Sequence, residues 1–250
     1  LMQGRSPVVE KDLDEIIGDG VRAGRLQAAA FAAEAIAARD ISLVCVGPPS
    51  NSNSSLNLEY VQRVCEEIGQ ALRTKEERHI VCVRSTMVPG STERVVIPGL
   101  KKGMGGELPS RVEVAVNPEF LREGTAVHDF FNPPKTVVGS EHESTAQTIV
   151  DLYRGIDAPV FMTPIKVAET VKYVDNVFHA LKISFANEIG SICKSVGVDS
   201  HEVMRIFTED RKLNFSPAYL KPGFAFGGSC LPKDVRALVY LGRSHDLDIP

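Results

Sequence analysis

The sequence lacks the features of three common protein classes. It has no unbroken apolar run approaching about 18 residues, which excludes a membrane-spanning helix. It has no Lys/Arg-rich run, and its formal net charge is −4, which argues against a nucleic-acid surface. Its histidines and cysteines show no metal-ligand spacing, which argues against a zinc site. We therefore expect no membrane, nucleic-acid or metal partner.

What is present is enough apolar sequence for a packed core. Hydrophobic residues make up 43% of the 250 residues and charged residues 24%, which excludes an intrinsically disordered chain. The 20 glycines and 15 prolines follow no period, which excludes a collagen-like chain. The five cysteines are odd in number and widely spaced, and no signal-peptide pattern is present, so we expect a reducing, cytoplasmic setting.

Short β-rich runs alternate with helical patterns in the first two-thirds of the chain. Each run holds four to six residues, mostly Val and Ile, which is typical of strands covered on both faces. Strands that alternate with helices predict an α/β fold with a doubly wound parallel sheet. The expected strands are 41–46, 79–83, 112–116, 135–138 and 159–162, and the expected helices are 56–73, a short one after Gly90, and 143–154.

The expected sheet lacks its usual beginning. A doubly wound nucleotide domain normally opens with a strand and a Gly-x-Gly-x-x-Gly turn, but residues 8–39 have the pattern of helix and connection. The chain also begins with Leu1 rather than Met, and it ends at Pro250 directly after a helical pattern. We therefore expect a fragment of a longer protein whose first βαβ unit is absent.

A single long helix is expected after the sheet. Apolar residues recur every three or four positions and predict a helix over 166–196, roughly 46 Å long at 1.5 Å per residue. Gly197 supplies a stop signal, and shorter helices are expected at 200–208 and from Leu231 onward. Because a lone helix of this length needs partners on more than one side, we expect a homodimer that forms through it.

The segment Phe226-Gly-Gly-Ser-Cys-Leu-Pro-Lys-Asp234 has the features of a nucleophilic cysteine. Its glycines let a ligand approach, and Cys230 lies at a predicted helix N-terminus, where the helix dipole favours the thiolate. Lys233 would act in the same direction, and Asp234 could accept a proton or hold a water. The alternative is a buried structural cysteine, which is the interpretation we favour for Cys45, Cys65, Cys82 and Cys193, because they lie in apolar patterns.

Two polar residues, Lys172 and Asn176, lie on the predicted long helix. Positions four apart share a helix face, so both side chains could donate to one oxygen that becomes negative in a transition state. Such pairs are also common on solvated faces, and the spacing alone favours a half-exposed Lys beside a polar neighbour. Both interpretations stay open on this pattern.

Small and polar residues follow three of the predicted strands. Ligands of open parallel sheets bind outside the carboxyl ends of strands, so these residues suggest one crevice, with ordinary loop polarity as the alternative. The loop 213–221 combines an aromatic ring, an amide and a lysine, which suits a ring and a phosphate. The residues after the strands are Gly47, Ser85, Thr86, Glu119 and Glu123.

Taken together, these motifs resemble those of the UDP-glucose/GDP-mannose dehydrogenase family. The resemblance covers essentially the whole chain, and it implies an NAD-binding, Rossmann-like domain over 1–163 and an all-α dimerisation domain over 164–250. The motifs that carry it are Ser6-Pro-Val-Val-Glu10, Cys45-Val-Gly47, Val83-Arg-Ser-Thr86, Asn117-Pro-Glu-Phe-Leu-Arg-Glu123, Lys172-x-x-x-Asn176, Phe185-Ala-Asn-Glu188 and Phe226 to Asp234.

The resemblance implies a four-electron oxidation of a nucleotide sugar. Its C6 hydroxyl becomes a carboxylate, two NAD⁺ each accept a hydride, and Cys230 holds first a thiohemiacetal and then a thioester. A thiol suits this chemistry because it retains an aldehyde that could otherwise escape. Residues 212–216 and 222–228 are closer to GDP-mannose enzymes of the family, so GDP-mannose is the expected substrate and UDP-glucose the alternative.

The resemblance also implies roles for individual residues. Lys172 and Asn176 would stabilise the oxyanion, Glu119 and Thr86 would serve proton transfer and water placement, and Asp234 would assist with the water. Family members often have Thr in place of Pro48, so a hydroxyl contact to the cofactor could be lost. The implied substrate contacts are Phe120, Leu121, Tyr219, Lys221, Gly227 and Gly228. The implied cofactor contacts are Gly47, Ser85 and Glu123.

Two other interpretations stay open. A single-oxidation dehydrogenase of the 6-phosphogluconate or 3-hydroxy-acid type has a similar layout, but one hydride transfer needs no thiol, so Cys230 argues against it. The chain could also be a dimerisation module or an inactive nucleotide-sugar binder. Because the dinucleotide turn would lie upstream of Leu1, we expect these 250 residues alone to bind NAD weakly and to show little turnover.

Overall fold

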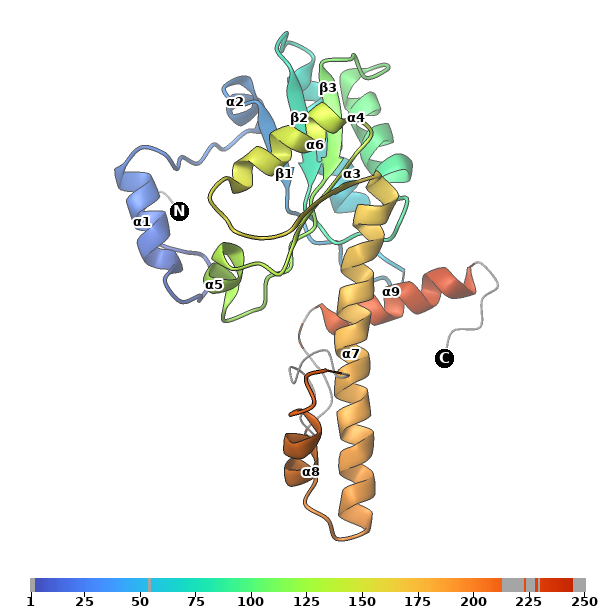
Figure 1. Cartoon of the computed structure of the whole chain (residues 1–250). Helices are drawn as coiled ribbons and strands as arrows, with labels where there is room; N and C mark the ends of the chain where they lie inside the picture. The colour runs from blue at the N-terminus through green and yellow to red at the C-terminus, as the bar shows by residue number, and fades with distance from the viewer. Residues whose placement is uncertain (1–2, 54, 213–222, 224–227, 229, 245–250) are drawn as a thin grey trace. The chain divides into compact units, whose positions relative to one another are not determined.

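The computed structural model describes residues 3–53, 55–212, 223, 228 and 230–244. The chain divides into two compact units, of which the first is Leu1–Pro48 with Asn57–Lys172 and the second is Pro49–Leu56 with Tyr173–Pro250. The first unit contains a sheet and the helices around it, and the described part of the second is helical (Figure 1). No helix among the described residues is both long and apolar enough to cross a membrane.

Five strands form one sheet, and their order in the sheet is their order in the chain. The predicted α/β fold is confirmed, and each predicted strand is present with its ends shifted by at most two residues. β1, β2 and β3 are parallel to one another, and β4 is parallel to β5. The strands are β1 (Ile41–Val44), β2 (His79–Val83), β3 (Val112–Val116), β4 (Thr136–Ser140) and β5 (Val160–Thr163).

The β3–β4 pair corrects the prediction of a wholly parallel sheet, because it is antiparallel. A parallel crossover usually needs a dozen or more residues, mostly helical, to carry the chain back along the sheet. The connection from 117 to 135 contains only the short helix α5 (Ala126–Phe131), which the sequence pattern did not predict. The pair joins only the last two residues of each strand, so β4 extends beyond the carboxyl end of β3.

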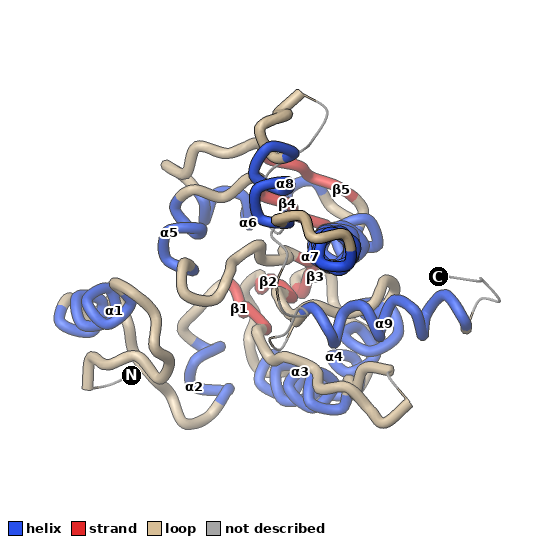
Figure 2. Tube along the Cα trace, turned by 90° about the horizontal axis from the view of Figure 1, so that it is seen from below, coloured by secondary structure: helices blue, strands red, loops and turns tan. Residues whose placement is uncertain are grey.

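Helices cover both faces of the central strands (Figure 2). One face carries α3 (Glu59–Leu72), the π-helical turn η1 (Thr92–Val96) and α4 (Ile97–Met104), whose apolar residues pack with Val81, Val83 and Val116. The opposite face carries α6 (Glu143–Val150), which packs against the side chains of alternate strand residues and is followed by the 3-10 turn η2 (Asp151–Tyr153). These alternate residues are Ile80, Cys82, Ala115 and Val138.

The expectation that every strand is covered on both faces is wrong at the two edges of the sheet. All residues of β2 are buried, as the Val/Ile pattern predicts for a central strand. In β1, however, Leu43 is exposed, and in β5 the first three residues are exposed. An edge strand has a neighbour on one side only, so an apolar run does not by itself place a strand in the centre of a sheet.

The chain before β1 forms α1 (Leu13–Arg22) and α2 (Ala32–Ala37). Residues 3–40 contain no strand, in agreement with the helical pattern of that segment. Ile36 of α2 joins the apolar core that α3 and α4 form on the sheet.

The predicted long helix is confirmed as α7 (Ile165–Ser195), and it ends as the sequence predicts. Gly197 has a φ of +71°, and the N–H groups of Gly197 and Val198 donate to the carbonyls of Lys194 and Cys193, which is a Schellman motif. Asp199 then caps α8 (Ser200–Phe207) by accepting a bond from the N–H of His201 at 2.9 Å. The last helix is α9 (Leu231–Arg243).

Two glycines allow α3 and α4 to pack backbone against backbone. A Cβ added to Gly103 of α4 would lie 2.1 Å from the carbonyl oxygen of Glu66, and one added to Gly69 of α3 would lie 2.4 Å from that of Leu100. Neither backbone oxygen can move without separating the two helices. Glycine at these positions is therefore required by packing.

We predict that Gly103→Ala destabilises the fold by about 3 kcal/mol, because the overpacking cost exceeds the roughly 1 kcal/mol that alanine gains in a helix. Urea unfolding followed by circular dichroism measures the change. The matched control is Gly106→Ala, since a Cβ at Gly106 meets no heavy atom within 4 Å. Equal stability of the two variants would show that the α3–α4 contact is not tight.

Candidate active site

The carboxyl ends of three neighbouring strands lie side by side at one end of the sheet in the first unit. Val44, Val83 and Val116 are the last residues of β1, β2 and β3, and they pair in register. The segments that follow them therefore leave the sheet side by side, where ligands of open parallel sheets bind. The predicted residues on these segments are Gly47, Ser85, Thr86, Glu119, Phe120, Leu121 and Glu123.

The residues that the resemblance assigns to the cofactor follow these strand ends. Ser85 ties β2 to β1, because its N–H and its hydroxyl both donate to the carbonyl of Val44 at 3.2 Å. Gly47 is exposed, and a Cβ added there would meet no heavy atom within 4 Å, so a ligand can approach its backbone. Thr86 is half-buried and Glu123 is exposed.

Asn117 connects four elements at the carboxyl end of β3. Its N–H donates to the carbonyl of Val83, and its side-chain amide donates to the carbonyl of Val137, both at 2.8 Å. Its side-chain oxygen accepts from the Arg84 guanidinium and the Tyr153 hydroxyl, which also bond each other. Asn117 is buried, so these bonds hold the start of the Asn117–Glu123 loop in a single position.

Sequence reasoning missed Arg84 and Tyr153. Arg84 stands in the motif Val83-Arg-Ser-Thr86 without an assigned role, and no signal in the sequence marks Tyr153. Burial raises the pKa of the Tyr153 hydroxyl, which therefore stays protonated and able to donate.

Lys172 of α7 lies against this loop. Its ammonium is 3.2 Å from a carboxylate oxygen of Glu119 and 5.5 Å from the centroid of the Phe120 ring. The other carboxylate oxygen of Glu119 accepts the N–H of Leu121 at 2.6 Å. Lys172 is buried, so the interpretation as a half-exposed, solvated lysine is wrong.

A small pocket of about 30 Å³ opens beside the loop. Glu119, Phe120 and Leu121 line it together with Arg84 and Tyr153. The ammonium of Lys135, a further lining residue, lies 4.9 Å from the Phe120 ring centroid. The predicted substrate residues on this loop therefore share a cavity that carries more basic than acidic side chains.

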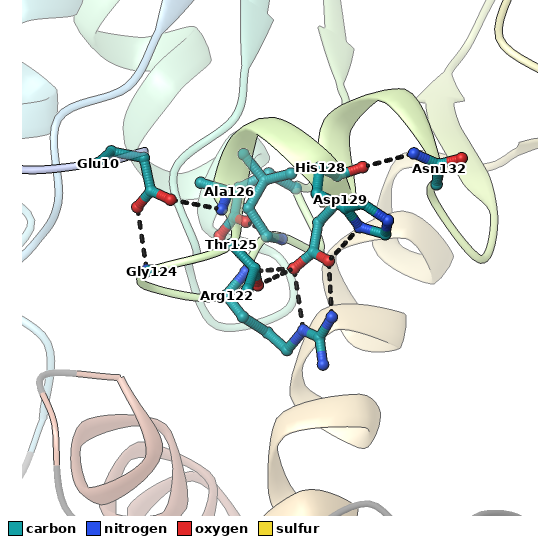
Figure 3. Close-up of polar contacts among 10 residues, drawn as sticks. Glu10, Arg122, Gly124, Thr125, Ala126, His128, Asp129 and Asn132 are labelled. Atoms are coloured by element: carbon teal, nitrogen blue, oxygen red, sulfur yellow. Dashed lines mark hydrogen bonds and ion pairs between the residues drawn. The ribbon is translucent and has the colours of Figure 1, made fainter. Parts of the chain in front are cut away.

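Asp129 of α5 bonds to residues at the end of the loop (Figure 3). The carboxylate of Asp129 accepts from the backbone N–H and the guanidinium of Arg122 and from the hydroxyl of Thr125. The Arg122 guanidinium holds the pKa of Asp129 well below its usual range, so the carboxylate stays ionised and the bonds persist in mild acid.

The second unit holds another group of predicted residues. The amide of Asn176 on α7 donates to one carboxylate oxygen of Asp234 on α9, and the ammonium of Lys233 lies 2.7 Å from the other oxygen. Asn176 and Asp234 are both buried. The charge of Lys233 is thus paired with Asp234, and its effect on the Cys230 thiolate stays a prediction.

Cys230 lies where the sequence predicts, directly before the first residue of α9. It is exposed, whereas Cys65, Cys82 and Cys193 are buried. Cys45 is also exposed, so its interpretation as a buried cysteine is wrong, because it follows the last residue of β1 at the sheet edge.

The remaining predicted substrate contacts lie in the segment before α9. Gly228 is exposed and has a φ of +80°, a left-handed conformation that glycine adopts without strain. Tyr219, Lys221 and Gly227 lie outside the described residues.

Comparisons with known proteins show which family the chain is similar to. The NAD binding domain of the UDP-glucose/GDP-mannose dehydrogenase family matches residues 1–157, and the central domain of that family matches 166–250. A GDP-mannose 6-dehydrogenase of Pseudomonas putida is 50% identical over 248 residues, which are 99% of this chain and 57% of that protein.

Solved structures show the same likeness. The chain matches a UDP-glucose dehydrogenase of Pyrobaculum islandicum with a TM-score of 0.92 and 41% identity, over 98% of this chain and 56% of that one. It matches a ternary complex of GDP-mannose dehydrogenase from Pseudomonas aeruginosa with a TM-score of 0.83 and 48% identity, over 99% of this chain and 57% of that one. The chain thus spans little more than half the length of these relatives.

We predict that iodoacetamide at pH 8 alkylates Cys230 first, because it is exposed at a helix N-terminus. Burial raises the pKa of Cys65 and Cys82 to about 12, so only about one thiol in ten thousand is a thiolate at pH 8. Although Cys45 is an exposed residue, partial desolvation of its thiol raises its pKa, so it should react at an intermediate rate.

A time course of peptide mass spectra measures the order of alkylation. Modification of Cys65 or Cys82 before Cys230 would contradict the assignment of Cys230 as the reactive thiol.

Proposed function

Since the chain belongs to the UDP-glucose/GDP-mannose dehydrogenase family, we propose that its protein oxidises the C6 alcohol of a nucleotide sugar to the carboxylate with NAD⁺. The observation that carries the proposal is the burial of Lys172 and Asn176 one helical turn apart on α7, each against a carboxylate. Two donors on one rigid helix can serve every oxyanion of a reaction with several steps.

The overall reaction consumes one alcohol, two NAD⁺ and one water, and it gives one carboxylate, two NADH and three protons. NAD⁺, when bound, accepts a hydride from C6 in each oxidation. The exposed backbone of Gly47, where an added Cβ would meet no heavy atom within 4 Å, supports a dinucleotide site at the strand ends. We propose that these residues and Glu123 contact it.

Cys230 supplies the covalent step of the proposal. After the first oxidation its sulfur adds to the aldehyde carbon, and the resulting thiohemiacetal loses the second hydride to become a thioester. Water then attacks the thioester carbon, the carbon–sulfur bond breaks, and the thiolate is regenerated. We propose that Lys172 and Asn176 donate to the oxygen on C6, and that Glu119 takes the protons of the alcohol and of the water.

Thr86 and Asp234 complete the proposed set by placing the attacking water. The carboxylate of Asp234 suits this role because its bonds with Asn176 and Lys233 hold it in one orientation. The proposed substrate contacts are those implied by the resemblance: Phe120, Leu121, Tyr219, Lys221, Gly227 and Gly228.

For the substrate, we propose GDP-mannose. The relative from Pseudomonas putida, at 50% identity, is named for GDP-mannose. The Pyrobaculum islandicum protein, at 41% identity, is named for UDP-glucose, which is therefore the second candidate.

We propose the domain boundary near Thr163, where β5 ends two residues before α7 begins. The five cysteines are free thiols, which supports the proposed cytoplasmic location.

We also propose that the protein is a homodimer that forms through α7. The exposed apolar residues of this helix recur at spacings of three, four and seven, so they form one stripe opposite its buried face. A continuous apolar stripe on an exposed helix is typical of an interface. Its members are Val167, Val174, Phe178, Leu181, Phe185 and Ile192, and the exposed Val196 follows the last residue of the helix.

We predict that the full-length protein releases two NADH per GDP-mannose, and that Cys230→Ala lowers formation of the carboxylate about a thousandfold or more. NADH absorbance and mass spectrometry of the sugar product give both quantities. Cys193→Ala is the control, because it removes a buried thiol of α7. Full carboxylate formation by Cys230→Ala would contradict the covalent mechanism, and faster turnover of UDP-glucose would contradict the substrate choice.

We predict that Leu181→Glu converts the dimer into a monomer, because it places a charge in the centre of the apolar stripe. Light scattering coupled to size-exclusion chromatography measures the mass. Lys194→Glu, which changes a charge outside the stripe, should remain dimeric. A wild-type protein that is monomeric at every concentration would contradict the proposal.

A further inference from the structure

The motif Ser6-Pro-Val-Val-Glu10 has no role in the proposed reaction, yet Glu10 contacts the loop that follows β3. Its carboxylate accepts the N–H of Gly124 and the N–H of Ala126, both at 3.0 Å (Figure 3). The two partners are more than a hundred residues away in the chain. Both lie in the same compact unit as Glu10.

These two N–H groups belong to a turn that has no local acceptor. Gly124 has a φ of +83°, and Ala126 is the first residue of α5. A Thr at the N-cap usually accepts from the first turn of its helix, but Thr125 makes no such bond, and its hydroxyl donates to Asp129. Glu10 therefore caps α5 in place of the local residue, and its charge makes the bonds stronger than neutral ones.

The two ends of the Asn117–Glu123 loop are held by different groups. Glu119 is held by Lys172 and by the N–H of Leu121, independently of Glu10. The end at Glu123 lies between Arg122, which Asp129 holds, and Gly124, which Glu10 holds. Removal of Glu10 should loosen the Glu123 end and leave the Glu119 end in place.

Because different groups hold the two ends of the loop, we infer that Glu10 is a positioning residue for the cofactor: its carboxylate fixes the turn that presents Glu123 to NAD⁺. The inference rests on the proposed function, in which Glu123 contacts the cofactor and Glu119 takes part in the chemistry. The KM for NAD⁺ should therefore depend on Glu10, and kcat should not.

The test compares Glu10→Ala, Glu10→Gln and wild type in the full-length protein, with Glu15→Ala, an exposed glutamate of α1, as the matched control. Glu10→Ala should raise the KM for NAD⁺ about tenfold and change kcat by less than about twofold, because a smaller fraction of the protein holds the binding conformation. Glu10→Gln keeps one acceptor oxygen, so it should restore part of the loss. Glu15→Ala should behave as wild type.

Hydrogen exchange followed by mass spectrometry gives a second readout that does not need activity. The amides of Gly124 and Ala126 should exchange about tenfold faster in Glu10→Ala, while the amide of Arg122, held by Asp129, should be unchanged. A purely structural role would lower the melting temperature or kcat and leave the KM for NAD⁺ unchanged, and that result would overturn the inference.

Unchanged exchange at Gly124 and Ala126 would also overturn it. A wild-type protein that never reduces NAD⁺ would instead overturn the proposed function, and with it the cofactor role of Glu10.

Discussion

The buried ammonium of Lys172 is the charge around which the carboxyl edge of the sheet is organised. A lysine buried without a partner costs several kcal/mol, so its neighbours must supply a negative group. Glu119 does so at 3.2 Å, and the face of Phe120 covers the same ammonium. The Asn117–Glu123 loop can provide both groups only because Asn117 fixes its start to β2 and β4.

A second buried charge lies in the same part of α7. Glu169, one turn before Lys172, is also buried, and it accepts the N–H groups of Gly90 and Thr92 and the hydroxyl of Thr92. Two opposite charges on one face of α7 thus find partners on two different loops after β2 and β3. One turn further along, Asn176 meets Asp234. The buried polar residues Glu169, Lys172 and Asn176 thus lie on one face of α7, and the exposed apolar stripe lies on the opposite face.

Local patterns in the sequence predict helices and strands well, and burial and strand pairing less well. The Val/Ile runs gave β2 and β3 with their observed ends, and the apolar period gave α7 and its glycine stop, because each signal lies within a few neighbouring residues. The antiparallel β3–β4 pair, the exposed Cys45 and the burial of Lys172 were not predictable in this way. Each of these three features depends either on which strand lies at the edge of the sheet or on contacts between residues that are far apart in the chain. The contact between Arg84 and Tyr153 is an example of the second kind.

A double-mutant cycle on kcat tests the Lys172–Glu119 pair most directly, with Lys172→Met, Glu119→Gln and the double variant in the full-length protein. If the two groups act as one unit, the double variant should lose no more than about threefold beyond the slower single variant. If the fold-losses in kcat of the two single variants multiply in the double variant, the two side chains act independently. That result would contradict the conclusion that Lys172 and Glu119 act as one unit.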